Sequence, residues 1–138
     1  MGSGDGNART QARGARGNPD AEAAARRALF AGNSLFSGLP PADIDILVAH
    51  ARAVRHRKGA VIFARGDEGR SLMAIRSGMV RISAMTAEGK EAVLNMLRPG
   101  QVFGEIALLD GKPRSADATA VEDTMLLVLE RRDFLPFV

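Results

Sequence analysis

Three side chains that can bind a phosphate and a sugar lie close together in the sequence: Glu105, Arg114 and Ser115. The forked guanidinium of an arginine pairs with two phosphate oxygens, and a serine offers a hydroxyl and a backbone amide to the same group. A glutamate repels phosphate, so Glu105 needs a neutral hydrogen-bond donor, and a ribose 2′-hydroxyl fits. Gly104 has no Cβ and lets the backbone approach the ligand. We therefore expect a site for a small cyclic phosphodiester that carries a ribose.

The backbone around these side chains also suits an anion. Residues 100–104 bring an expected strand to a glycine, and Glu105–Leu109 has the composition of a short helical turn. A phosphate at the start of such a turn meets unpaired backbone N–H groups and the positive end of the local dipole. Taken alone, the turn is an ordinary helix start and Pro113–Ser115 an ordinary loop. Their combination within a few residues is what indicates a site.

Strands are the main elements that must position this site. After Val54 the apolar residues follow a period of two, and glycines separate the short apolar runs. Ala87–Lys90 indicates a hairpin turn. The expected strands are Val54–Arg57, Val61–Ala64, Leu72–Arg76, Val80–Met85, Ala92–Leu97, Ser115–Ala120 and Met125–Glu130. This pattern predicts a mainly β fold with flanking helices, in which an antiparallel, jelly-roll-like β-roll closes its sheet edges.

Helices are expected on both sides of the strand region. Asp20–Phe30 consists of strong helix formers with an acidic start, and Pro41–Ala53 has apolar residues at helical spacing. The apolar face of this second helix is made of Ile44, Leu47, Val48 and Ala51. Leu35–Pro40 indicates a turn between the two, and Arg131–Leu135 begins a C-terminal helix. Residues 1–20 hold almost no large apolar residue, so we expect a disordered basic tail and then one domain over residues 21–138.

The order of strand, Gly-Glu, short apolar turn, Pro-Arg-Ser-Ala and strand resembles the phosphate-binding cassette of cyclic nucleotide-binding domains. Val61–Asp67, Ser77–Val80 and Leu97–Gly100 also resemble strand and turn signatures of that family. The resemblance runs from Leu35 to the C-terminus. Within the family, Gly89–Glu91, Leu108–Gly111 and Arg114–Ala116 look most like the bacterial catabolite-activator and fumarate-nitrate-regulator (Crp/Fnr) class of transcription regulators.

The resemblance implies a role for each matching residue. Glu105 would bind the ribose, and Arg114 and Ser115 the cyclic phosphate of cyclic AMP or cyclic GMP, with no cofactor and no metal. The family's pattern also implies that further residues line the pocket: Phe103, Gly104, Ile106, Ala107 and Ala116 in the cassette, and Ile82, Val93, Leu94 and Asn95 in the strands. Ile82, Val93 and Leu94 would equally serve as core residues of a β-roll. Met73 stands where members often have an aromatic residue, a departure that alters packing.

The resemblance also implies a longer protein. The dimerisation helix and the DNA-binding helix-turn-helix of the Crp/Fnr class would follow Val138, so this chain would reach DNA only through a C-terminal domain that it lacks, and a dimer is expected for the full-length form. No apolar stretch approaches the roughly 20 residues that span a bilayer. We expect no membrane partner and a cytoplasmic location.

Other functions find weaker support in the sequence. Most of the net charge of +3 lies in residues 1–30, which hold five arginines and three acidic residues, so the rest of the chain is nearly neutral. The chain also has no Trp or Tyr with which to stack nucleic-acid bases. With no cysteine, an iron–sulfur sensor is excluded. Haem binding or an enzyme's metal site would depend on His50 and His56, which have no carboxylates at metal-ligand spacing. The remaining alternatives are a different effector, or a non-binding interaction domain in which Glu105 and Arg114 pair with each other.

Overall fold

Two four-stranded antiparallel sheets form the body of the protein. The structure is a computed structural model, and it describes residues 19–33, 36–104 and 112–137. One sheet has the order β1-β8-β3-β6 and the other the order β2-β7-β4-β5. The strands are β1 (Arg52–His56), β2 (Val61–Phe63), β3 (Ser71–Ser77), β4 (Val80–Met85), β5 (Glu91–Leu97), β6 (Val102–Phe103), β7 (Asp117–Ala120) and β8 (Thr124–Glu130). The expected mainly β fold with an antiparallel roll is confirmed.

Strands β3 and β8 are buried on both faces, which explains their uninterrupted apolar runs. They pair in antiparallel register, with Met73 opposite Val128 and Ala74 opposite Leu127. Side chains alternate between the two faces of a strand. Accordingly, Leu72, Ala74, Leu127 and Leu129 pack with the helices. Met73, Ile75, Leu126 and Val128 pack inside the roll.

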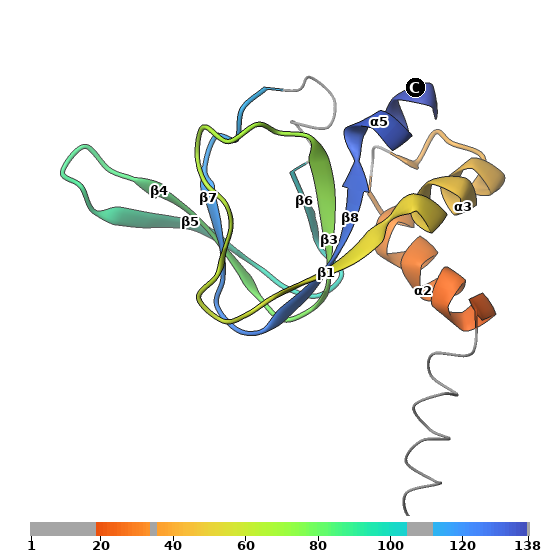
Figure 1. Ribbon diagram of the computed structural model, residues 1–138, viewed down its shortest axis with the longest axis horizontal. Coiled ribbons are helices and arrows are strands. Elements are labelled where there is room, and N and C mark those ends of the chain that lie inside the picture. The colour runs from red at the N-terminus through yellow and green to blue at the C-terminus, as the bar shows by residue number, and fades with distance from the viewer. Residues whose placement is uncertain (1–18, 34–35, 105–111, 138) are drawn as a thin grey trace, which may run out of the picture.

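The helices cover one face of the β1-β8-β3-β6 sheet. They are α2 (Pro19–Ala31), α3 (Pro41–His50), α5 (Arg131–Phe134) and the 3-10 turn η2 (Leu135–Phe137). Their contact with the sheet centres on three fully buried rings, Phe30, Phe36 and Phe134, in which Phe36 meets each of the others edge-on. Figure 1 shows the helices gathered on one side of the strands, with the β4–β5 hairpin projecting on the other. In the part of the chain that is described, no helix is long and apolar enough to cross a membrane.

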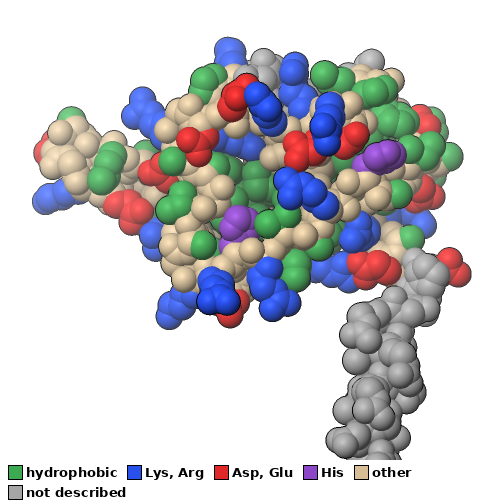
Figure 2. Space-filling model, viewed as in Figure 1, with side chains coloured by type: hydrophobic (Ala, Val, Ile, Leu, Met, Phe, Trp, Pro, Cys, Tyr) green, Lys and Arg blue, Asp and Glu red, His purple; other side chains and the backbone are tan. Residues whose placement is uncertain are grey.

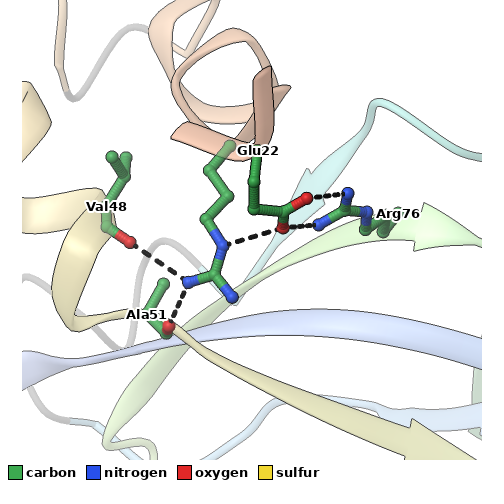
Figure 3. A network of polar contacts seen from close by, with 5 residues as sticks. Glu22, Val48, Ala51 and Arg76 are labelled. Atoms are coloured by element: carbon green, nitrogen blue, oxygen red, sulfur yellow. Dashed lines mark hydrogen bonds and ion pairs between the residues drawn. The ribbon is translucent and has the colours of Figure 1, made fainter. Parts of the chain in front are cut away.

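A polar network fastens α2 to its neighbours (Figure 3). Glu22 of α2 accepts hydrogen bonds from both Arg76 of β3 and Arg26 one helical turn away. Arg26 also donates to the carbonyl oxygen of Ala51, 2.6 Å away, just after α3 ends. The hydrogen bond from Arg76 is the main reason that the pKa of Glu22 falls to about 2. This Glu22–Arg26–Arg76 network therefore joins α2, β3 and the end of α3.

Some element boundaries differ from those the sequence predicted. The second helix ends at His50 rather than Ala53, because Arg52 and Ala53 pair with β8 and so extend β1 backwards. The strand expected from Ser115 begins only at Asp117, after the loop that carries Arg114. The first helix runs from Pro19 to Ala31, one residue longer at each end than expected, so Asp20 belongs to this helix and not to the tail. The rest of the expected tail, residues 1–18, lies outside the described residues.

Candidate ligand pocket

A pocket of about 720 Å³ opens where strands of both sheets meet the loop that carries Arg114. Its lining is largely apolar, with a few polar side chains placed among the apolar ones. The lining residues are Phe63, Ile82, Asn95, Leu97, Val102, Phe103, Gly104, Lys112, Pro113, Arg114, Ser115 and Ala116. A concave apolar site with a few convergent polar groups is the usual form of a small-molecule site.

Arg114 is the buried cation of this pocket. The residue is 7% exposed. Its Nη2 donates to the carbonyl oxygen of Ser71 at 2.8 Å and its Nη1 to that of Gly104 at 3.3 Å. The guanidinium carbon lies 4.3 Å from the ring centroid of Phe63. Burial lowers the pKa of Arg114, and the charge of Asp67 acts in the opposite direction. No carboxylate among the described residues forms an ion pair with Arg114, and its buried Nε has no hydrogen-bond partner there.

Gly104 allows the close approach of this guanidinium. Its backbone has a φ of +88°, in the left-handed region that favours glycine. A Cβ at this position would lie 2.7 Å from Nη1 of Arg114 and 3.0 Å from the carbonyl oxygen of Ser71. The glycine expected from the sequence to admit a ligand is thus also required by the arginine.

The structure brings most of the described candidate residues together. Seven of them line the pocket: Phe103, Gly104, Arg114, Ser115, Ala116, Ile82 and Asn95. Glu105, Ile106 and Ala107 lie outside the described residues. Val93 and Leu94 are not among the lining residues, and they are 54% and 60% exposed.

A register shift explains why Val93 does not follow Asn95 into the pocket. Ile82 of β4 lies opposite Asn95, but the next residue, Ser83, lies opposite Val93, so Leu94 is an extra residue in β5. Such a bulge breaks the alternation by which residues two apart share a face. The expectation that Val93 and Leu94 wall the pocket therefore disagrees with this geometry.

Several lining residues gave no chemical signal in the sequence. Phe63, Leu97 and Val102 lie in apolar runs that any β-roll would need. Ser71 holds Arg114 through its backbone carbonyl oxygen, and such a contact cannot be predicted from the residue type. The family-like segment Val61–Asp67 was the available clue, since it contains Phe63 and the turn that follows it.

Neither histidine lies in the pocket lining. His50 of α3 is exposed, with Nδ1 2.8 Å from the carbonyl oxygen of Ile46, and burial lowers the pKa of His56 in β1. Figure 2 shows the two histidines well apart on the surface drawn. Among the described residues, no group of three or more His, Cys, Asp and Glu side chains can hold a metal ion.

A family model described as "Cyclic nucleotide-binding domain" matches residues 53–138, more than half of the chain. This chain belongs to the cyclic nucleotide-binding domain family. The matched segment contains all the pocket-lining residues and all eight strands that the structure describes, except that it begins one residue after the start of β1.

Bacterial cyclic AMP receptors are among the relatives of this domain. A cyclic AMP receptor protein of Thermus thermophilus is 42% identical over 107 residues, 78% of this chain and 50% of its own. A CRP-like cAMP-activated global transcriptional regulator of Mycobacterium tuberculosis is 30% identical over 103 residues, 75% of this chain and 46% of its own. The regulatory domain of Toxoplasma gondii PKA, solved with cAMP, has a TM-score of 0.81 and 26% identity, covering 88% of this chain and 46% of that one.

The resemblance to the Crp/Fnr class is thus confirmed at the level of the domain. The chain spans about half the length of the curated relatives it matches.

Proposed function

We propose that this domain binds cyclic AMP or cyclic GMP in the described pocket, as the ligand sensor of a Crp/Fnr-type transcription regulator. Arg114 and Ser115 would hold the cyclic phosphate, and Glu105 the ribose 2′-hydroxyl. Ile82 and Asn95 would lie along the sugar and base. The domain itself would catalyse no reaction and would need no cofactor.

One observation carries the proposal: the guanidinium of Arg114 is buried in an apolar pocket and contacts only neutral groups among the described residues. Burying a charge is costly unless it is paired. An anion in the pocket would pair with the guanidinium in a desolvated setting, where charge-assisted hydrogen bonds are strong. The size and apolar lining of the pocket suit the remainder of a nucleoside.

The element that responds to ligand binding would belong to a region that this chain does not contain, corresponding to the other half of the relatives. In a regulator, ligand binding shifts a neighbouring element only by its different affinity for two arrangements of that element. We therefore propose DNA binding and dimerisation only for a longer form of this protein.

Thermal melting with and without ligand tests the proposed binding. Cyclic AMP or cyclic GMP at 100 times its dissociation constant should stabilise the chain by roughly 2.7 kcal/mol. That corresponds to a rise in melting temperature of roughly 10 °C for a chain of this size. The control is 5′-AMP, which has the same base and sugar and an uncyclised phosphate. If neither cyclic nucleotide raises the melting temperature more than 5′-AMP does, the alternatives of another effector or a non-binding interaction domain gain support.

A further inference from the structure

The ring of Phe63 lies against the guanidinium of Arg114. Phe63 ends β2 and lines the same pocket, and the guanidinium carbon is 4.3 Å from its ring centroid. The face of an aromatic ring carries negative partial charge and attracts a cation, most strongly where water is excluded. Since Arg114 is only 7% exposed, water is largely excluded from this contact.

Among the described residues, the other groups that hold the guanidinium are also neutral. They are the carbonyl oxygens of Ser71 and Gly104, with the Ser71 hydroxyl oxygen 3.4 Å from Nη2. The Asp67 carboxylate acts on Arg114 through its charge, and its Oδ2 accepts a hydrogen bond from the backbone N–H of Ala64. A carboxylate paired directly with the guanidinium would compete with an incoming phosphate. Neutral partners fix the side chain and leave its charge available.

The turn after Phe63 fixes the backbone of the same arginine. The N–H of Gly66 donates to the carbonyl oxygen of Arg114 at 2.8 Å, and the N–H of Arg114 donates to that of Asp67 at 2.8 Å. Gly66 has a φ of +91°, which this turn requires and which glycine adopts without strain. Arg114 is therefore joined to this segment twice, through the Phe63 ring at its side chain and through the turn after Phe63 at its backbone.

We propose that Phe63 is a positioning residue for ligand binding: its ring holds the Arg114 guanidinium in place before the cyclic phosphate arrives. The inference rests on the proposed function, because it concerns how the same site prepares its cation. An arginine that is already ordered loses less side-chain freedom when the ligand binds. Removing the ring should therefore weaken binding of cyclic AMP by roughly three- to tenfold.

The test replaces Phe63 by phenylalanines with increasing numbers of ring fluorines, which withdraw charge from the ring face and change its shape little. Isothermal titration calorimetry gives the dissociation constant of each variant for cyclic AMP. We expect the constant to rise steadily with fluorination at Phe63 and to stay flat for the same series at Phe36, a buried ring among the helices outside the pocket. Phe63→Leu should bind as weakly as the most fluorinated variant, and Phe63→Tyr about as well as the original chain.

A nuclear magnetic resonance measurement without ligand separates the two possible failures. The Nε–H proton of Arg114, beside the Phe63 ring, should carry a ring-current shift that Phe63→Leu abolishes and Phe63→Tyr keeps. If the original chain binds cyclic AMP and both the titration series and the Nε–H signal are insensitive to Phe63, the inference is overturned while the proposed function stands. If the original chain binds no cyclic nucleotide, the proposed function fails and the positioning role fails with it, while the Nε–H signal still reports the contact itself.

Discussion

Arg114 and Gly104 depend on each other's side-chain size and position. The guanidinium fills the space that a Cβ at position 104 would need, and the glycine carbonyl accepts one of its hydrogen bonds. Both residues were expected in the site from their types and spacing. Their contacts with Ser71 and Phe63 could not be predicted, because one acts through its backbone and the other belongs to an apolar strand with no chemical signature.

Arg114→Leu should abolish most cyclic nucleotide binding and leave the fold intact. Removing a desolvated charge partner typically costs about 2 to 5 kcal/mol of binding free energy, a loss of roughly 30- to several-thousand-fold in affinity. Titration calorimetry measures the loss, and circular dichroism checks the fold. The matched control is Arg98→Leu, an exposed arginine in the turn after β5 that does not line the pocket. An Arg114→Leu variant that binds as tightly as the original chain would remove Arg114 from the site.

Gly104→Ala should destabilise the protein more than Gly59→Ala does. Both glycines have a φ of +88°, so both substitutions introduce the same backbone strain, about 1 kcal/mol. Nothing lies within 4 Å of a Cβ at Gly59, whereas a Cβ at Gly104 meets Arg114 and the Ser71 carbonyl. Urea denaturation of the two variants should show a difference of about 1 kcal/mol or more in the free energy of unfolding. Equal losses would mean that the guanidinium moves aside freely.

At the scale of elements, the sequence predicted the strands better than their ends. The apolar period located β3, β4 and β8 closely, because their burial on fixed faces decides which residues alternate. The sequence pattern predicted the end of α3 three residues too late. Residues 51–53 fit a helical pattern, but Arg52 and Ala53 pair with β8 instead. The bulge at Leu94, which turns Val93 away from the pocket, depends on pairing with β4 and has no local signal.

The Glu22–Arg26–Arg76 network predicts a dependence of stability on pH. The pKa of Glu22 is about 2 in the folded protein, below its ordinary value of 4.5. A group whose pKa is lowered by folding stabilises the protein fully above its unfolded pKa, and this contribution is lost as the pH falls from 4.5 toward 2. Because the Glu22 side chain is 35% exposed, solvent screens the pairs, and we expect a contribution of about 1 kcal/mol.

Glu22→Gln should therefore lower the free energy of unfolding by about 1 kcal/mol at pH 7 and by much less near pH 2.5. Chemical denaturation at both pH values measures the two differences. The control is Glu88→Gln in the β4–β5 turn, an exposed carboxylate for which no ion pair is seen among the described residues. A difference between Glu22→Gln and the original chain that is the same at both pH values would contradict the assigned pKa.

At the scale of the whole molecule, β3 and β8 connect the pocket to the helices. One face of these strands packs inside the roll with Phe103, and the other packs against α2, α3 and α5. Arg76 at one end of β3 holds α2, and Ser71 at the other end holds Arg114. The mainly β class, the flanking helices and the family could all be predicted from the sequence. Base preference could not, because it depends on side chains that a ligand would meet in three dimensions.

The central claim is that this domain binds a cyclic nucleotide, and isothermal titration calorimetry with cyclic AMP and cyclic GMP in parallel, at modest salt, tests it most directly. The account predicts saturable binding of one nucleotide per chain for at least one of them, and the ratio of the two affinities then gives the base preference of the roll. No heat of binding with either nucleotide, from a chain whose fold is verified by its melting transition, would contradict the account.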